Sequence, residues 1–312
     1  MIAHCERSSL DIEGIRLSMA RGLSIVRAMH ISGSTRVFMI LGDPVEQVRA
    51  PETFNHLFAR HGVDAVLVPA QVSPHDFAAF VRQLFKARNI DGLILTIPHK
   101  TAMVALLDRC DRLGNVAQAV NAVRRNDDGS IEGALFDGIG FVKGLEHFGI
   151  AQRGARALVV GAGGAGAAIA ASLADRGVAH LALFDVDAAR SAAVAARLRA
   201  VWPAVATVAA ASPDPAGFDL VVNATPLGLN RADPLPFDPA RVDAGAAVVD
   251  TLMKNQPTPL LRACQARGTV AHPGFEMMIQ QAPETLAFLG LHELARVVAQ
   301  DSSELRVLMQ AI

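Results

Sequence analysis

A cluster of glycines near the middle of the 312-residue chain has the composition needed to hold the pyrophosphate of a dinucleotide. It follows an apolar segment, Ala157–Val160, and precedes a helix-type segment that runs from Ala165 to about Arg176. The cluster consists of Gly161, Ala162, Gly163, Gly164, Ala165 and Gly166. Glycines permit a tight turn and a close approach of the backbone to phosphate, while the start of a helix offers free N–H groups. The order strand, glycines, helix therefore predicts a bound dinucleotide, although glycines also serve ordinary turns and close packing.

One acidic residue stands where such a fold binds the adenosine ribose. Asp185 ends the next apolar segment, Leu181–Phe184, about 20 residues beyond the glycines. Its carboxylate could accept hydrogen bonds from both ribose hydroxyls and would repel a 2′-phosphate, so we expect NAD as the cofactor. Arg190 is the nearby cation that leaves NADP as the alternative. The competing interpretation makes Asp185 a simple helix N-cap.

Strand-type and helix-type segments alternate along most of the chain, from Arg36 onward. In a first series, strands are expected at 37–41, 65–68 and 92–96, and helices at 51–60, 74–87 and 100–109. A second series begins at Arg156, with strands expected at 157–160, 181–184, 220–223, 247–250 and 269–271. This alternation predicts an α/β fold of two units, each built on a mostly parallel sheet with helices on both faces. Glycines crowd between the two series at positions 133, 138 and 140, which marks the expected joint.

The composition argues against several classes of partner. The net charge of −1 gives no electrostatic reason to expect nucleic acid or a membrane surface. No apolar run approaches the length of a membrane span, and ten histidines without paired ligand spacing predict no metal. Three scattered cysteines form no CxxC pair and indicate a reduced, cytoplasmic compartment. Residues 1–33 look unlike the rest, and we expect an over-extended start or a loose tail there.

Four further motifs follow one another in a distinctive order. They read L-T-I-P-H-K at 95–100, A-V-N-A at 119–122, F-D-G-I-G at 136–140 and N-A-T-P-L-G at 223–228. Together with the glycine cluster they resemble the motifs of the shikimate/quinate dehydrogenase family, over a span from about Val37 to Leu289. The resemblance implies an N-terminal α/β substrate domain, a Rossmann NAD-binding domain, and C-terminal helices that return to the first domain. We assign these three parts to residues 34–137, 138–274 and 275–312.

The resemblance also implies which residues form the site. Lys100 and Asp137 would face each other across the cleft between the domains as the catalytic pair. Oxidising a secondary alcohol needs a hydride acceptor above the carbon and a base at the hydroxyl, and which of the two residues carries the proton is left open. Thr96, Asn121 and Gln281 would contact the substrate. Asn223, Thr225, Gly228 and Gly274 would join the glycine cluster in binding the cofactor. Each also has a plainer interpretation, such as a solvated helix lysine or a turn-forming aspartate.

The family's first motif contains two serines that bind the substrate carboxylate, and both are missing here. Val48 and Ala50 stand at these positions in the run 42–51. Hydrogen bonds to a charged group are worth roughly 1.5–3 kcal/mol each, so losing two would weaken shikimate binding by about 10²–10⁴-fold. Arg49 could grip a carboxylate instead, unless it is an exposed loop residue that points away. Three further departures from the family pattern predict a more apolar pocket: Ile94, Leu135 and Met253.

The prediction is therefore an NAD-dependent oxidoreductase that acts on a ring secondary alcohol of a shikimate- or quinate-like hydroxy acid. It would serve aromatic amino acid biosynthesis or quinate metabolism as a monomer or homodimer, with a small cyclic hydroxy acid as its partner molecule. Two alternatives stay open: a catalytically idle NAD-binding sensor or regulatory module, and an enzyme like methylene-tetrahydrofolate dehydrogenase. Retention of both Lys100 and Asp137 argues against the sensor, because a mere binder has no need of that pair.

Overall fold

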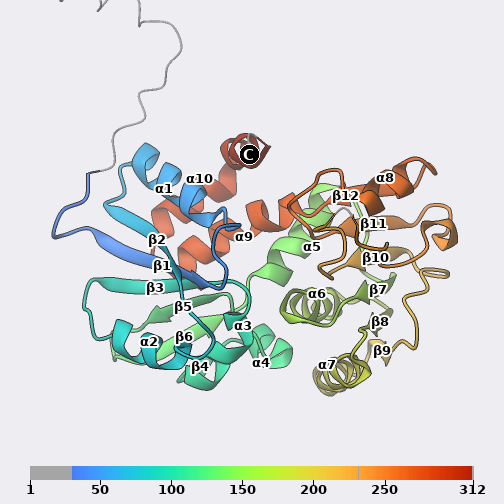
Figure 1. The fold of residues 1–312 in the computed structure, drawn as a ribbon, viewed down its shortest axis with the longest axis horizontal. Helices are drawn as coiled ribbons and strands as arrows, with labels where there is room; N and C mark the ends of the chain where they lie inside the picture. Colours follow the sequence, from blue (N-terminus) through green and yellow to red (C-terminus); the bar gives the residue numbers. More distant parts are fainter. Residues whose placement is uncertain (1–29, 231, 311–312) are drawn as a thin grey trace, which may run out of the picture.

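The computed structural model describes residues 30–230 and 232–310, which form two sheets that stand side by side (Figure 1). Each sheet has six strands, and helices cover both faces of each. The expected α/β class is confirmed. Of the expected N-terminal extension, residues 1–29 lie outside the described residues. Within the described residues, no helix is long and apolar enough to cross a membrane.

The first sheet combines parallel and antiparallel strands. Its order is β2 (Ala65–Gln71), β1 (Arg36–Gly42), β3 (Ile90–Leu95), β5 (Ala122–Arg125), β6 (Ile131–Ala134) and β4 (Arg109–Cys110). The strands β2, β1 and β3 run parallel, whereas β5 pairs antiparallel with both β3 and β6. The antiparallel hairpin β5–β6 was not expected, and residues 109–110 form β4 where the end of a helix was expected. These short strands carry charged side chains, so they lack the continuous apolar runs of buried parallel strands.

Two apolar clusters cover the opposite faces of this sheet. On one face, Phe38 and Ile40 of β1 pack with α1 (Ala50–His61), which buries Phe54, Leu57 and Phe58 at helical spacing. The other face packs against α2 (Phe77–Leu84), α3 (His99–Ala102) and the short 3₁₀ helix η1 (Met103–Leu106). The helix α4 (Arg112–Ala117) follows β4 and lies toward the second sheet, where it contacts α6 (Gly164–Asp175). The parallel strands β1 and β3 therefore point their carboxyl ends toward the second half of the molecule (Figure 1).

The second sheet is wholly parallel. Its order is β12 (Val270–Pro273), β11 (Ala247–Asp250), β10 (Leu220–Asn223), β7 (Arg156–Val160), β8 (His180–Phe184) and β9 (Ala206–Ala209). Counted from β7, this is the 3-2-1-4-5-6 order of a dinucleotide-binding sheet, whose crevice opens where the order reverses between β7 and β10. One face packs against α6 and α7 (Ala188–Val201), and the other against α8 (Pro259–Gln265), while η2 (Pro239–Arg241) contacts α8.

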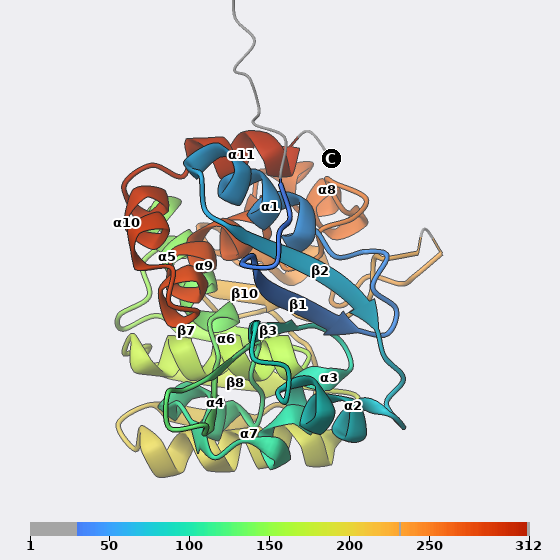
Figure 2. The same ribbon diagram turned by 90° about the vertical axis from the view of Figure 1, so that its left-hand side faces the viewer.

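The helices α5 (Asp137–His147) and α9 (Phe275–Phe288) join the two halves. A Cβ added at Gly138 would collide with the backbone of Ala168 on α6, and one added at Gly140 would collide with the backbone of Met277 on α9. These glycines lie inside α5, and they allow it to pack closely between its two neighbours. The last helices, α10 (His292–Gln300) and α11 (Ser303–Gln310), continue onto the first sheet beside α1 (Figure 2). The expected return of the C-terminal helices to the first half is confirmed.

Candidate active site

Lys100 and Asp137 meet at the junction of the two halves. Lys100 lies on α3, just after the carboxyl end of β3, and Asp137 is the first residue of α5. Lys100 Nζ donates a hydrogen bond to Asp137 Oδ2. The two side chains are only 18% and 5% exposed, so protein rather than water surrounds most of the pair. A shielded ammonium and carboxylate interact more strongly than an exposed pair, and they can pass a proton to or from a bound hydroxyl.

Two amide side chains hold Asp137 from the other side. Asn121 Nδ2 donates to Asp137 Oδ1 at 2.9 Å and to Gln281 Oε1 at 2.7 Å. Asn121 Oδ1 in turn accepts the backbone N–H of Phe136 at 2.8 Å, which fixes the orientation of the amide. Asn121 precedes β5 and Gln281 lies on α9, so segments 160 positions apart in the sequence converge here. The structure thus brings four predicted residues into one hydrogen-bonded group, and their catalytic and substrate-binding roles stay predictions.

Backbone hydrogen bonds connect the segment around Lys100 to neighbouring segments of the first half. The carbonyl of Lys100 accepts the N–H of Val120 at 3.0 Å, next to Asn121. The N–H of Thr96 donates to the carbonyl of Leu41 at 3.0 Å, which joins the ends of β1 and β3. A Cβ on Gly42 would collide with Thr96 Cγ2, so the half-buried side chain of Thr96 lies against the end of β1. Thr96 is therefore near the group of four but makes no hydrogen bond to it.

The glycine loop has the shape that a dinucleotide requires. Gly161 has φ +101° and its Cβ position lies 2.8 Å from the carbonyl of Ala224, so only glycine fits there. A Cβ at Gly166 would collide with the carbonyl of Gly161. Because Gly166 has no side chain, α6 can start directly beneath the loop. By contrast, no described atom lies within 4 Å of a Cβ built on Gly163, so the surface in front of the loop is open. The helix α6 behind it has 12 residues and presents its N-terminus to this open side.

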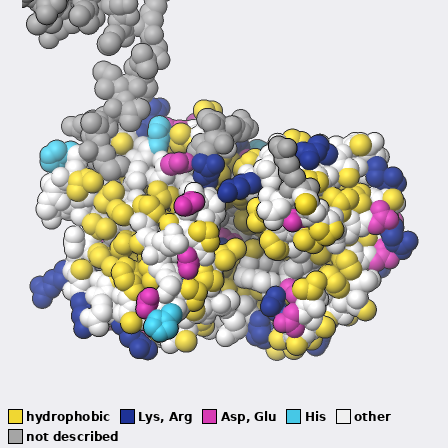
Figure 3. Space-filling view, in the orientation of Figure 1, with side chains coloured by type: hydrophobic (Ala, Val, Ile, Leu, Met, Phe, Trp, Pro, Cys, Tyr) yellow, Lys and Arg dark blue, Asp and Glu magenta, His cyan; other side chains and the backbone are white. Residues whose placement is uncertain are grey.

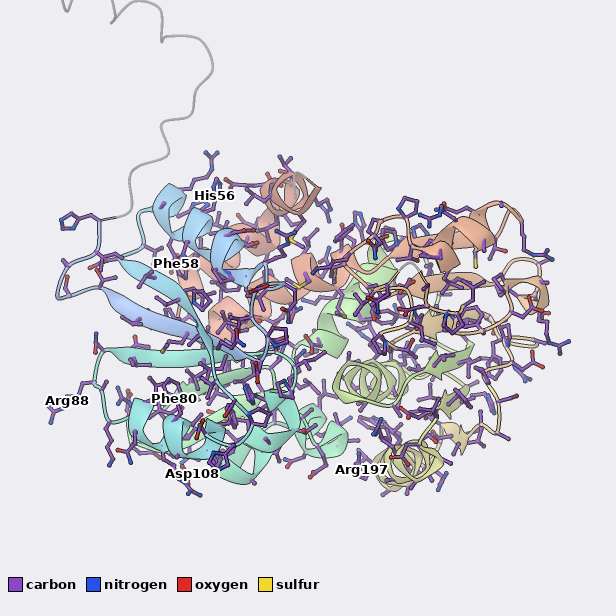
Figure 4. The ribbon with its side chains drawn as sticks, in the orientation of Figure 1. His56, Phe58, Phe80, Arg88, Asp108 and Arg197 are labelled. Carbon is purple, nitrogen blue, oxygen red and sulfur yellow. The ribbon has the colours of Figure 1, made fainter. Side chains whose placement is uncertain are left out.

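The glycine loop also lies beside the Lys100–Asp137 pair. A Cβ built on Gly164 would stand 3.8 Å from Cδ of Lys100. A cavity of about 340 Å³ extends from the loop between the two halves, with Thr101 and Gln118 on one wall and Arg190 and Arg197 on the other. Figure 3 shows that the surface is hollowed along this junction. Arg197, labelled in Figure 4, lines the cavity, and its Nε donates to the carbonyl of Val116 at 2.6 Å.

The loop after β10 is ordered by its own asparagine. Asn223 is fully buried, and its Oδ1 accepts the backbone N–H of Thr225 at 3.0 Å and the Thr225 hydroxyl at 2.7 Å. Asn223 Nδ2 donates to Asp250 Oδ1 at 3.0 Å. Gly228 closes the loop with φ +111°, a conformation that favours glycine. The side chain of Asn223 therefore orders this loop, and the cofactor-binding roles expected for Asn223, Thr225 and Gly228 stay predictions.

Asp250 was missed by the sequence reasoning. It ends the buried strand β11 and accepts hydrogen bonds from Asn223, the Thr258 hydroxyl and the N–H of Leu252. Burial raises the pKa of the Asp250 carboxyl, against the lowering effect of these hydrogen bonds. Gly274 packs against it, because a Cβ there would lie 3.0 Å from the carbonyl of Asp250. The same signal that marked Asp185, an acid at the end of an apolar strand, could have identified Asp250.

Asp185 is bound to the glycine loop as well as to its own turn. Its Oδ2 accepts the N–H of Ala162 at 2.8 Å, and its Oδ1 accepts the N–H of Asp187 at 2.9 Å. Arg190 Nη1 lies 3.3 Å from Asp185 Oδ1, and its Nη2 lies 3.5 Å from Asp187 Oδ2. The N-cap of α7 is Asp187, which accepts two backbone N–H groups there. The alternative interpretation of Asp185 as the cap of that helix is therefore wrong.

The residues of the divergent first motif lie in different environments. Arg49 precedes α1 with its side chain one-third exposed, and its Nη1 lies 3.5 Å from Glu52 Oε2. Ala50 is 7% exposed and faces α9 and α11 in the apolar interior. Leu135 and Ile94 are also buried in apolar clusters, so they contribute almost no surface to the cavity between the halves. The more apolar pocket expected from these residues and Met253 stays a prediction.

Comparison with known proteins supplies the family. A family model described as the shikimate dehydrogenase substrate binding domain matches residues 40–123. A shikimate dehydrogenase (NADP(+)) of Acidiphilium cryptum is 39% identical over 279 residues, which cover 88% of this chain and 99% of the relative. One of Rubrobacter xylanophilus is 36% identical over 262 residues, covering 82% of this chain and 90% of the relative. The chain belongs to the shikimate/quinate dehydrogenase family.

The membership makes this protein an oxidoreductase of the shikimate/quinate dehydrogenase type. The solved structures agree with the fold. Quinate dehydrogenase from Corynebacterium glutamicum, in complex with NAD, matches with a TM-score of 0.76 at 27% identity, over 89% of this chain and 99% of that one. The predicted family is confirmed, together with the two-part Rossmann arrangement of the shikimate/quinate dehydrogenases.

Proposed function

We propose that this enzyme transfers hydride between NAD and a ring secondary alcohol of a shikimate- or quinate-like hydroxy acid, with Lys100 and Asp137 as the pair that moves the hydroxyl proton. The observation that carries the proposal is the shielded hydrogen bond from Lys100 to Asp137, located beside Gly164 of the glycine loop. A ring hydroxyl at this junction can reach the proton-transfer pair while its carbon faces the open side of the loop.

The residues of the site would each have a separate task in the reaction. The dinucleotide, when bound, supplies the hydride acceptor. As the hydride leaves the carbinol carbon, the hydroxyl proton passes to the Lys100–Asp137 pair and the substrate oxygen becomes a carbonyl. Asn121 keeps Asp137 oriented by donating to its second oxygen, and Gln281 keeps Asn121 oriented in turn. In the reverse direction the same pair returns the proton to the oxygen.

Two carboxylates after the end of β8 support the choice of NAD over NADP. A 2′-phosphate would approach the carboxylates of Asp185 and Asp187, and the repulsion favours a free ribose hydroxyl. Arg190 is the cation in this turn, and both aspartates already share its guanidinium. The two relatives described above are named as NADP-dependent, whereas the matching quinate dehydrogenase was solved with NAD. The acidic turn of this chain is the reason for proposing NAD.

The substrate proposed is a cyclic hydroxy acid whose carboxylate is held differently from the family's usual manner. Neither Val48 nor Ala50 has a hydroxyl to donate, so the binding energy from two serines is absent. Arg49 lies between them, and its ion pair with Glu52 at 3.5 Å is long and leaves donors available. A guanidinium can bind a carboxylate through two parallel hydrogen bonds.

Replacement of Lys100 tests the proposed function. The variant Lys100→Ala should lose about 10²–10⁴-fold in kcat, the range for one general acid–base group, while KM changes little. Reduction of NAD or NADP would be followed by nicotinamide absorbance, with shikimate, quinate and related ring alcohols as substrates. Lys143→Ala is the matched control, because it removes another lysine–carboxylate pair, with Glu284, between α5 and α9. Tight NAD binding without turnover of any ring alcohol would instead support the idle sensor.

A further inference from the structure

His99 is fixed in the interior directly beside Lys100. Its side chain is 1% exposed, and its Nε2 lies 2.8 Å from the carbonyl of Val72, the residue that follows β2. A carbonyl only accepts hydrogen bonds, so Nε2 carries the proton and donates it. The imidazole also stacks on Phe77 of α2, with ring centroids 4.1 Å apart and planes 3° from parallel.

This hydrogen bond connects the lysine loop to the loops after β1 and β2. Val72 donates its own N–H to the carbonyl of Gly42 at 3.1 Å, and Asp43 donates to the carbonyl of Ile97 at 3.0 Å. The ends of three neighbouring strands are therefore linked to one another by backbone groups, with the His99 side chain as the link from α3. On the opposite side, the Lys100 carbonyl accepts the N–H of Val120. Lys100 is thus held between two attachments, one on each side of the helix that carries it.

We propose that His99 is a positioning residue for the proton-transfer pair: its hydrogen bond to Val72 and its stack on Phe77 hold α3 where Lys100 reaches Asp137. The inference rests on the proposed function of Lys100 and adds a residue that acts through it. The helix α3 has only four residues before the chain continues into η1, and His99 is the buried one among them. The donor of its side chain therefore attaches the first residue of α3 to the interior.

The donor and the ring can be removed separately. His99→Phe keeps an aromatic ring against Phe77 but leaves the Val72 carbonyl without its donor. His99→Gln loses the ring but places an amide N–H near the position of Nε2. His75→Phe is the control for the substitution itself, because His75 is an exposed histidine, 94% accessible, that pairs with Asp76. Each variant would be made in the full chain, and its folded fraction measured by circular dichroism before the kinetics.

The values of kcat and the melting temperature together distinguish a positioning role from a purely stabilising one. His99→Phe should lower kcat about tenfold, the factor equivalent to one hydrogen bond, with KM for the alcohol and Kd for NAD within about twofold of wild type. His99→Gln should restore kcat to within about threefold of wild type, although it too lowers the melting temperature by losing the aromatic stack. A role limited to stability would lower the melting temperature of both variants and leave kcat per folded molecule unchanged, which would overturn the proposal.

Crystal structures of the two variants give a readout that needs no substrate. In His99→Phe the contact between Lys100 and Asp137 should be broken or displaced, and in His99→Gln it should be kept. An unchanged contact in His99→Phe would also overturn the proposal. The failure of the proposed function looks different, because then Lys100→Ala itself would keep its kcat. If Lys100→Ala is inactive but His99→Phe behaves as wild type, only the role of His99 is refuted.

Discussion

The carboxylate of Asp185 accepts a 2.8 Å hydrogen bond from the backbone N–H of Ala162, so the end of β8 is joined to the glycine loop. This single bond links the residue proposed to select the ribose to the loop proposed to bind the pyrophosphate. Each carboxylate oxygen accepts one backbone N–H and a longer hydrogen bond from Arg190 Nη1, so a ribose hydroxyl would compete with the arginine for Asp185. Changes at Asp185 should therefore affect both the choice and the strength of cofactor binding.

We predict that kcat/KM is at least about tenfold higher with NAD than with NADP, equivalent to 1.4 kcal/mol or more. Asp185→Asn should reduce this ratio, because the amide removes the negative charge that repels a 2′-phosphate yet can still accept from Ala162. Steady-state kinetics with both cofactors give the ratio. Asp187→Asn is the control for charge at the more exposed cap of α7, and it should change the ratio less. A wild-type preference for NADP would contradict the prediction.

Gly163 offers a test of the dinucleotide site that leaves the fold intact. A Cβ at this position meets no described atom within 4 Å and its φ of −71° suits alanine, so Gly163→Ala should keep the wild-type melting temperature. It should weaken NAD binding by about tenfold or more, because the methyl group would occupy the space that the pyrophosphate approaches. Titration calorimetry with NAD measures the affinity. Gly33→Ala, at another open position, should change neither property.

Arg49→Ala tests how the carboxylate of the substrate is held. If the guanidinium binds it, KM should rise about 10-fold or more for acidic ring alcohols, in line with the loss of a charge-assisted hydrogen bond. Neutral ring alcohols should keep their KM, because they offer no partner for the arginine. Glu52→Gln serves as the control, since it removes the ion-pair partner and leaves Arg49 in place. Equal effects on acidic and neutral substrates would refute the proposed role.

We expect the free energy of unfolding to depend on pH in the acid range, because Glu276 on α9 binds Arg306 of α11. Burial alone would raise the pKa of Glu276, but hydrogen bonds from Arg306 and Gln280 outweigh it and hold the pKa below its ordinary 4.5. Because the folded value is the lower one, the stabilising contribution is complete above about pH 4.5 and is lost as the pH falls through the folded pKa. Denaturant unfolding at a series of pH values measures how the free energy of unfolding changes with pH.

The matching variant is Arg306→Ala, which leaves the buried carboxylate of Glu276 without its bidentate partner. It should lower the free energy of unfolding near pH 7 by about 1–3 kcal/mol, and the difference from wild type should shrink as Glu276 becomes protonated. Arg296→Ala removes an exposed arginine–glutamate pair on α10 and should change the free energy by less than about 0.5 kcal/mol. A pH-independent difference for Arg306→Ala would count against this account.

Five of the six strands of the second sheet could be predicted from short stretches of sequence, whereas β9 and part of the first sheet could not. The β7 strand is a buried apolar run followed by glycines, and both signals are local. In β5 and β6, Arg124 and Glu132 lie opposite each other and form an ion pair at 2.7 Å. Their charges hide the apolar pattern, and only the pairing of the two strands explains them. The turn residues between them, 126–130, were the remaining local signal.

Residue types, their order and their nearest neighbours along the chain were enough to predict the glycine loop between β7 and α6, the acid at the end of β8 and the family of the protein. They could not establish which distant side chains touch. Lys100 and Asp137 are 37 positions apart, and Asn121 and Gln281 are 160 apart. These four meet because α5 packs closely between α6 and α9, a relationship in three dimensions that no local pattern contains. For the same reason Leu135 proved to be a core residue: burial depends on what the rest of the chain places around a position.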